Sequence, residues 1–431
     1  SKRIQPKHIL SALSKQQALV DFLIYKEVDF KTGHYKTEQI IAFVANPGTG
    51  VHFIQLGDLL PITHLIKTYR QAIEPNDNND LWFSSKERQQ SLIQTSQALY
   101  KKLWQPLSHA LDDKKQVFII PDGILHLLPF KALQNSQGQY LDQQIKLTRL
   151  GSARDIVFPK QSTHNKKAII LANPLFSANK DSVTKQNNII SRSLRSLNFA
   201  PLPGTQTESE SIQTILQQLN YPVKLYTQGQ ASEATINKVT SPKILHLATH
   251  GFFLEKLKVA EGKTPARGIQ WNKQGKLAIA NIENPLARSG LAFSYANQGV
   301  KGEKQGDGTD GILTALEVLN LNLEGTELVT LSACETSVGE VSIGEGVYSL
   351  NRAFQEAGAK AVLSTLWSIS DKATSLFMQK FYQRFLNEHS AQQALQQTQE
   401  EFKKSQQWND PFFWAGFVVT GQDYSMKSLR H

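Results

Sequence analysis

Short apolar runs alternate with helix-like segments over residues 168–366, and this alternation constrains the fold more than any other feature of the sequence. Runs of this length and composition are typical of buried strands. They lie at 168–171, 223–226, 244–249, 327–331 and 361–366. Strands joined through helices pair in parallel with right-handed crossovers. The pattern therefore predicts an α/β fold, in which a mostly parallel sheet has helices on both faces.

The first part of the chain is expected to form a lobe of its own. Apolar alternation predicts strands at 18–30, 39–45 and 50–56, and helical spacing predicts helices at 63–73 and 84–107. The run 116–133 is expected to be a buried strand that ends in Pro-Asp-Gly and continues as a second apolar run. The polar segment 160–167 then interrupts the pattern. We place a boundary there and expect two domains, residues 1–158 and 159–431, in line with the usual ~100–200 residues per domain.

Composition narrows the class of protein. The chain has 431 residues and one cysteine, which excludes an internal disulfide and a cysteine-rich metal site. Cysteine scarcity fits a reducing compartment, so we expect a cytoplasmic protein. No apolar run reaches the ~18 residues that a membrane-spanning helix needs. The first residue is Ser, and ordered-looking sequence follows at once, as expected of a fragment of a longer protein.

The charge gives no sign of a nucleic-acid partner. The formal net charge is +10, but the basic residues are scattered and are not interleaved with aromatic residues. A nucleic-acid surface is more concentrated than this. No metal or other cofactor is expected either, because the stretch GDGTDG at 306–311 lacks the spacing and the closing Glu of a calcium loop.

Two strand ends carry residues suited to catalysis. In open parallel sheets, sites form at the carboxyl ends of strands. The run KILHLATHG ends in His250 and Gly251, and LVTLSACETSVG carries the single cysteine, Cys334. An imidazole can take the proton of a thiol, and the thiolate then attacks a carbonyl. The expected oxyanion donors are the backbone N–H groups of Gly251 and Cys334. His246 lies inside its strand and is expected to be a hydrogen-bonded core residue.

From the residues alone the role of Cys334 stays open. A lone cysteine is usually a buried and inert residue, and it is otherwise a candidate nucleophile. Spacing does not decide between the two. The aromatic run at 411–419, PFFWAGFVV, is expected to be a core strand rather than a ligand site.

Several long motifs, taken together, resemble the CHAT family of caspase-like cysteine peptidases. They are HLATHGFF, NPLARSGLAFSYAN, DGILTALEVLNLNLEGTELVTLSACETSVG, GEGVYSLNRAFQEAGAKAVLSTLWSISD and DPFFWAGFVVTG, with IIPDGILHLLPFKAL and ARDI upstream. Members of this family are related to separases and are often attached to tetratricopeptide repeats. The resemblance covers nearly the whole chain. In one departure, Ser337 stands where the family commonly has Gly, which is expected to alter the loop and not the dyad.

The resemblance implies a caspase-like α/β sandwich in which residues 1–158 form a pseudo-protease lobe. His250 matches the family's catalytic histidine, and Cys334 matches its nucleophile. His126 in the first lobe has no cysteine partner and is expected to be structural. The implied function is regulated cleavage of a protein substrate, under an upstream tetratricopeptide-repeat sensor. The alternatives are a catalytically silent interaction module and a hydrolase or transferase of small acyl groups. Self-cleavage within the loop 254–283 is a further possibility.

The implied specificity is for a basic residue at the cleavage position. Asp371 resembles an acidic residue that receives a basic side chain in the separase relatives, and Trp367 is the expected aromatic wall. A carboxylate in such a pocket favours Arg or Lys. Alternatively, Asp371 is only the N-cap of a helix that begins at Lys372. Asp310 and Asp307 are a rival source of the acidic group.

Overall fold

The computed structural model describes most of the chain. The described residues are 3–28, 35–74, 85–161, 165–177, 184–185, 197–253, 270–271, 277–278, 286, 288–332, 350–387 and 390–422. Cys334, Ser337 and most of the loop 254–283 lie outside these ranges. Within them, no helix combines the length and the apolar character needed to cross a membrane.

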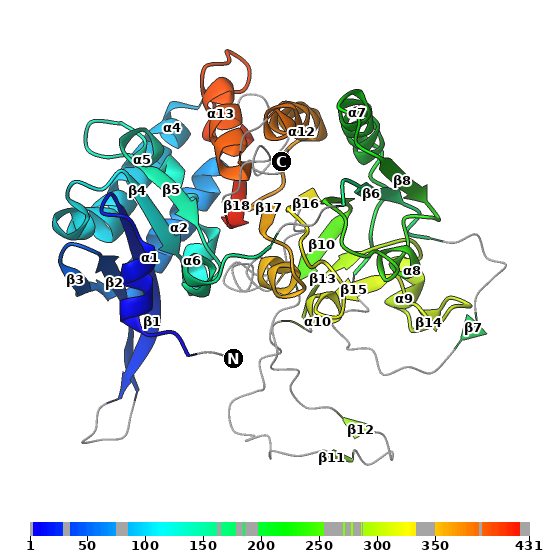
Figure 1. Cartoon of the computed structure of the whole chain (residues 1–431), viewed down its shortest axis with the longest axis horizontal. Helices are drawn as coiled ribbons and strands as arrows, with labels where there is room; N and C mark the ends of the chain where they lie inside the picture. Colours follow the sequence, from blue (N-terminus) through cyan, green and yellow to red (C-terminus); the bar gives the residue numbers. More distant parts are fainter. Residues whose placement is uncertain are drawn as a thin grey trace.

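One mixed, mostly parallel sheet of 11 strands runs through the molecule (Figure 1). Its strand order is β3-β2-β1-β4-β5-β18-β17-β16-β9-β6-β8. The strands are β1 (Gln17–Val28), β2 (Tyr35–Asn46), β3 (Gly50–Asp58), β4 (Gln116–Ile120), β5 (Lys146–Arg149), β6 (Ala168–Pro174), β8 (Val223–Gln228), β9 (Ile244–Ala248), β16 (Leu328–Ser332), β17 (Ala361–Thr365) and β18 (Phe417–Gly421). The β1–β2–β3 edge is antiparallel, and β18 runs antiparallel to β17.

Smaller sheets lie beside the large one. An antiparallel sheet consists of β10 (His250–Phe253), β13 (Ser289–Ala292) and β15 (Ile312–Thr314). Two further pairs are β7 (Thr184–Lys185) with β14 (Glu303–Lys304), and β11 (Gln270–Trp271) with β12 (Leu277–Ala278).

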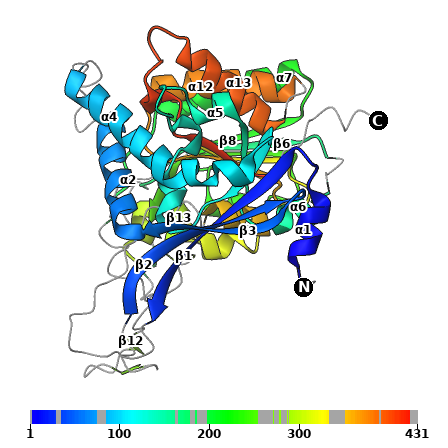
Figure 2. The same ribbon diagram turned by 90° about the vertical axis from the view of Figure 1, so that its left-hand side faces the viewer.

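Helices cover both faces of the large sheet, as the sequence predicts. One face packs against α2 (Leu59–Ile73), α4 (Lys86–Leu99), α5 (Leu141–Gln144), α7 (Gly204–Gln218), α12 (Asp371–Leu386) and α13 (Ala391–Lys403). The opposite side carries α1 (Pro6–Ala12), α6 (Arg154–Val157), α8 (Glu233–Ile236), α9 (Ala296–Gly299) and α10 (Ala315–Val318). In Figure 2, α7, α12 and α13 lie above the sheet, and β1 and β2 are its strands nearest the viewer.

Strand β9 shows why the central strands read as continuous apolar runs. All five of its residues are buried. Ile244 and Ala248 pack toward α7 and α12, and Leu245 and Leu247 pack toward α8 and α10. A strand that is covered on both faces has no solvent-exposed side, so polar residues do not alternate with apolar ones along it. The predicted α/β class is therefore confirmed.

The two halves of the chain meet inside the sheet. β5 pairs in parallel with β18, with Arg149 opposite Thr420. The main apolar core contains residues of both halves, Ile119 and Phe377 among them. The expected boundary at 158/159 lies in the connection between α6 and β6, and the division into two domains stays a prediction.

Within the run 116–133, the strand ends at Ile120, directly before the predicted Pro-Asp-Gly turn, and the second apolar run forms 3-10 helices at Gly123–Leu127 and Phe130–Ala132. The aromatic run is less regular than predicted. In the aromatic run 411–419, Pro411–Phe413 is a 3-10 helix because Asp410 accepts the N–H of Phe412 and holds the chain in a turn. Irregular helices at Tyr100–Trp104 and Gln105–Leu111 extend α4.

Candidate active site

The end of β9 is where the structure positions the predicted histidine. β9 and β16 pair in parallel, and their last pair is Ala248 opposite Ser332. His250 comes two residues after Ala248, and Cys334 comes two residues after Ser332 in the sequence. Cys334 itself lies outside the described residues, so one member of the predicted dyad is placed and the other is not.

His250 begins β10, a second short strand that turns away from β9. It pairs with Ala292 of β13 and is only 8% exposed. Its imidazole packs against two phenylalanines that also contact each other, with ring centroids 5.1 Å from Phe176 and 5.7 Å from Phe199. Neither phenylalanine was predicted from the sequence to lie near the site.

A backbone carbonyl orients the imidazole of His250. Nε2 lies 2.8 Å from the carbonyl oxygen of Ala200. A carbonyl oxygen only accepts hydrogen bonds, so Nε2 carries the proton and Nδ1 carries the lone pair. Nδ1 is buried and has no hydrogen-bond partner among the described residues. Burial lowers the pKa of His250, and the hydrogen bond to Ala200 raises it by less. The result is a neutral imidazole with a free basic nitrogen.

A buried polar cluster lies at the same strands, directly before the candidate site. His246 Nδ1 is 3.1 Å from the hydroxyl of Tyr382, which is 2.8 Å from Thr330 Oγ1. His246 Nε2 lies at ion-pair distance, 3.2 Å, from Glu208 Oε1, although the two are not aligned as a hydrogen bond. Ser332 Oγ donates to Glu208 Oε2 at 3.0 Å. The prediction that His246 is a hydrogen-bonded core residue is confirmed.

This cluster ties two helices to the two strands of the candidate site. Glu208 comes from α7 and Tyr382 from α12, while His246 and Ser332 come from β9 and β16. Ser332 is the last residue of β16, so its bond to Glu208 fixes the strand where the chain departs toward Cys334. Sequence reasoning missed Glu208 and Tyr382. The helical spacing of the apolar residues could have indicated Glu208, because it shares the buried face of α7 with them.

Asp371 is the first residue of α12, and Ser370 occupies the N-cap position. The interpretation of Asp371 as the N-cap is therefore wrong by one residue, although a carboxylate in the first turn still interacts favourably with the helix dipole. Asp371 is exposed, and its carboxylate lies against Gly204, where a Cβ atom would collide with it. The same segment carries Ala200, the partner of His250.

Trp367 is a core residue in the structure. It is 2% exposed, and its Nε1 donates to the carbonyl oxygen of Phe412 at 2.9 Å. Its indole packs under Gly416, which has no side chain to block the ring. The position gives no support to Trp367 as the aromatic wall of a specificity pocket, because both the ring and its polar N–H are used inside the core.

Asp310 lies near the small sheet that carries His250. Ile312 of β15 is opposite Ala292, and Ala292 is opposite His250. Asp310 is half-buried, and its carboxylate accepts the N–H of Ile312 at 2.9 Å. Burial raises the pKa of Asp310.

The remaining predicted residues have simpler surroundings. Asp307 is exposed and bonds to Thr309 in its own turn, and these hydrogen bonds lower its pKa. Gly251 is buried and pairs with Leu291 of β13. Within the described ranges, no three His, Cys, Asp or Glu side chains gather as a metal site.

Comparison with known proteins gives one family and several relatives. The model of the CHAT domain matches residues 94–422. Human tetratricopeptide repeat protein 28 is 25% identical over 338 residues, which is 73% of this chain and 12% of that protein. The mouse protein of the same name is 24% identical over 365 residues, 79% of this chain and 14% of that protein. The chain thus spans a small part of these relatives.

A solved structure has the same fold. A chain in the crystal structure of the Saccharomyces cerevisiae separase-securin complex superposes with a TM-score of 0.50 at 11% identity. The match covers 97% of this chain and 30% of that chain. At this identity the likeness concerns the fold alone, and it agrees with the α/β arrangement described above.

Proposed function

This chain belongs to the CHAT domain family, and from that premise we propose that it is a regulated cysteine endopeptidase that cleaves a protein partner with a Cys334–His250 dyad. The observation that carries the proposal is the hydrogen bond from His250 Nε2 to Ala200, which leaves a buried, basic Nδ1 without a partner among the described residues. A base that is oriented by a third group is the usual arrangement for activating a nucleophile.

Chain geometry supports the pairing of the two residues. A fully extended chain advances at most ~3.6 Å per residue, so Cys334 Cα lies within about 7 Å of Ser332 Cα. His250 has the same sequence offset from Ala248, and Ala248 is opposite Ser332 on the neighbouring strand. Neighbouring strands are ~4.8 Å apart. The chain connectivity therefore allows the thiol to approach the imidazole, as the proposed dyad requires.

In the proposed reaction, His250 acts first as a base and then as an acid. Nδ1 of His250 takes the thiol proton, and the Cys334 thiolate forms a bond to the carbonyl carbon of the substrate. The backbone N–H groups of Gly251 and Cys334 stabilise the oxyanion. The imidazolium, held by Ala200, then protonates the leaving amine as the C–N bond breaks. Water hydrolyses the resulting thioester, which releases the acid product and restores the thiol.

We propose that cleavage follows a basic residue. Asp371 supports this because its exposed carboxylate contacts Gly204, in the segment that also carries Ala200. Asp310 is the second candidate for the acidic group.

The names of the relatives support an upstream tetratricopeptide-repeat sensor as the regulator. We further propose a reducing cytoplasmic setting, in which the single thiol stays reduced.

The test is a library of fluorogenic peptides ending in Arg, Lys or Asp, with wild type, Cys334→Ala and His250→Gln. We expect turnover after Arg and Lys by wild type alone, and a higher KM for these peptides in Asp371→Asn. Mass spectrometry of the same incubation reveals any cut within 254–283. Turnover that persists in Cys334→Ala would reject the mechanism.

A second readout covers the case in which an activating signal is missing. Iodoacetamide alkylates thiolates, so an activated Cys334 is expected to react faster than free cysteine at neutral pH and to slow in His250→Gln. Slow alkylation that is unchanged in His250→Gln, together with no turnover, would favour the catalytically silent interaction module.

A further inference from the structure

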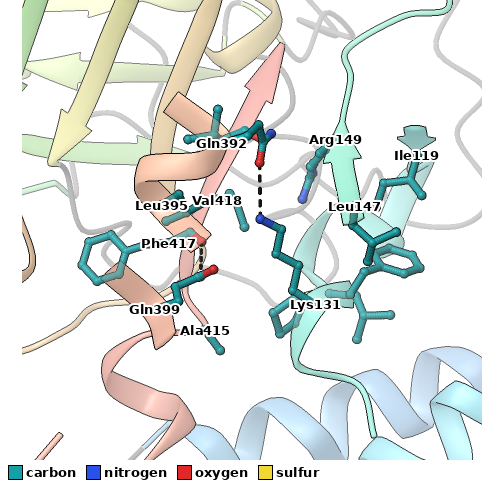
Figure 3. A pocket seen from close by; sticks show the side chains of 14 residues that line it. Ile119, Lys131, Leu147, Arg149, Gln392, Leu395, Gln399, Ala415, Phe417 and Val418 are labelled. Carbon is teal, nitrogen blue, oxygen red and sulfur yellow. Dashed lines mark hydrogen bonds between the residues drawn. The ribbon is translucent and has the colours of Figure 1, made fainter. Parts of the chain in front are cut away.

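The large sheet is nearly split where its two halves meet. β5 and β18 pair through one register position, Arg149 opposite Thr420, whereas β18 pairs with β17 along its whole length. Beside this junction lies a small, narrow pocket that is partly open to solvent (Figure 3). Its walls come from β4, β5, β18, α13, the segment 128–131 and Ala415.

Two glutamine side chains of α13 donate hydrogen bonds to backbone carbonyl groups of β18 that a neighbouring strand would otherwise pair with. Gln399 Nε2 donates to the carbonyl oxygen of Phe417 at 3.1 Å, and Gln392 Nε2 donates to that of Val419 at 2.8 Å. Buried carbonyl groups need such donors. Because the glutamine side chains supply these donors, the two carbonyl groups of β18 are hydrogen-bonded without β5. The gap between β5 and β18 therefore leaves neither of these carbonyl groups unpaired.

Arg149 brings a buried charge to the pocket without a counter-charge. It is 7% exposed, and its two terminal nitrogens bond to His126, Nη1 to the carbonyl oxygen at 3.1 Å and Nη2 to Nδ1 at 2.7 Å. Its Nε is buried without a hydrogen-bond partner, and no carboxylate pairs with Arg149, in the part of the chain described. Burial lowers its pKa only to about 10, so the guanidinium stays charged at neutral pH.

The surroundings of Arg149 favour an anion. Lys131, whose Nζ is 3.3 Å from Gln392 Oε1, is the second cation of the pocket. Figure 3 shows the ends of both basic side chains in the space between β5 and α13. None of the described lining residues is Asp or Glu. A buried charge without a partner costs several kcal/mol, so a site that keeps one is suited to a ligand of opposite charge.

We propose that this pocket binds a small organic monoanion, a carboxylate with a short aliphatic chain. The carboxylate accepts hydrogen bonds from Arg149 Nε and from the ammonium group of Lys131. The aliphatic part contacts Leu147 of β5, Leu395 of α13 and Val418 of β18, which line the same space. A bound ligand therefore joins the two halves of the chain at the point where the sheet has one paired position.

The test uses the full chain and sodium salts of acetate, butyrate and hexanoate at constant ionic strength. Calorimetric titration is expected to give saturable binding, with butyrate tighter than acetate. The unfolding midpoint is expected to rise with the logarithm of ligand concentration above the dissociation constant. Butyramide, which is similar in size and uncharged, is expected to bind at least about tenfold more weakly.

Variants separate this site from general anion effects. Arg149→Leu is expected to lose butyrate binding by about tenfold or more, and Lys131→Met by less. The matched controls are Arg352→Leu and Lys102→Met, at exposed positions outside the pocket, which are expected to bind like wild type.

Three results would overturn the proposal. They are the absence of saturable binding to wild type, equal binding of butyrate and butyramide, and unchanged binding in folded Arg149→Leu. If Arg149→Leu does not fold, the comparison of butyrate with butyramide on wild type and the loss in Lys131→Met decide the question. Because the readout is binding, the outcome does not depend on peptidase activity.

Discussion

His250 shows how its neighbours give a common side chain a defined chemical state. The phenylalanines at 5.1 and 5.7 Å exclude water from the ring, which disfavours the imidazolium. The carbonyl of Ala200 decides which nitrogen carries the proton. Neither effect comes from the residue itself, and together they leave Nδ1 as a base.

The pKa of His250 can be measured in Cys334→Ala, which removes coupling to the thiol. We expect selective NMR titration to give a midpoint below 6.5, because burial lowers the pKa from that value. The unfolded state then binds more protons, so this histidine costs stability as the pH falls below 6.5. Phe176→Ala is expected to raise the midpoint, and Phe43→Ala, on β2 near the other edge of the sheet, is the control. A midpoint above 6.5 in Cys334→Ala contradicts the prediction.

Glu233 is a second residue whose charge state depends on its surroundings. Its Oε2 accepts the N–H groups of Asp310 at 3.0 Å and Gly311 at 2.9 Å, and this anchors the turn before β15. Burial, with a smaller effect from the charge of Asp310, raises the pKa of Glu233 from 4.5 to about 7. The folded state therefore holds more protons between these values, and its stability falls as the pH rises through that window.

Glu233→Gln keeps the accepting oxygen and removes the charge. We expect the variant to gain stability relative to wild type between about pH 5 and pH 8, by roughly 1 kcal/mol after allowance for solvent screening. Urea unfolding at both pH values measures the difference, with Glu356→Gln on an exposed helix surface as the control. A difference that does not change with pH would show that the charge of Glu233 has no influence on folding.

At the scale of elements, one polar cluster joins β9, β16, α7 and α12. Apolar packing alone leaves the rotation of a helix over a sheet loosely specified, whereas a buried hydroxyl or carboxylate has to meet its partners. Tyr382 meets both His246 and Thr330, and Glu208 meets Ser332. These contacts set the two helices against the strand ends that precede His250 and Cys334.

Tyr382→Phe removes the hydroxyl at the centre of this cluster. It leaves His246 Nδ1 and Thr330 Oγ1 without that partner, so we expect a loss of about 1–3 kcal/mol in the free energy of unfolding. Urea denaturation measures the loss. Tyr25→Phe on β1 is the matched control and is expected to change stability by less. Equal stability of Tyr382→Phe and wild type would mean that the cluster does not hold the helices in place.

At the scale of the whole molecule, the chain is held together across its halves. Arg88 of α4 and Asp410 form a bidentate ion pair, in which Nη1 lies 2.6 Å from Oδ2 and Nη2 lies 2.8 Å from Oδ1. The pair joins a helix of the first half of the chain to a segment near its C-terminal end. The side chain of Arg88 is 2% exposed and that of Asp410 is 15% exposed. The shared core and this ion pair make the two halves dependent on each other.

Asp410→Ala is expected to destabilise the whole chain by on the order of 3 kcal/mol, because it removes one partner of a buried ion pair. The urea midpoint is expected to fall as one transition seen equally by fluorescence and circular dichroism. Glu356→Ala breaks the exposed pair with Arg352 and is expected to cost less than about 0.5 kcal/mol. Independent unfolding of one half in Asp410→Ala would contradict the dependence of the halves.

The sequence by itself determined the strands, the larger helices, the α/β class and the family. These depend on local periodicity and on contiguous motifs, which a linear string contains. It also placed His250 at a strand end and His246 in the core. The sequence did not predict the boundaries of the short elements, because a single capping residue such as Asp410 starts a 3-10 helix within an apolar run.

Only the tertiary structure decided which groups meet. The carbonyl of Ala200 is 50 residues from His250 and carries no side-chain signal, and Tyr382 is 136 residues from His246. Trp367 went to the core, although its sequence position suited a pocket wall equally well. Arg149 is a buried charge at the junction where β5 and β18 share one paired position. One pattern of apolar residues is compatible with many tertiary arrangements. The packing of the whole chain selects one of them and so decides which side chains meet.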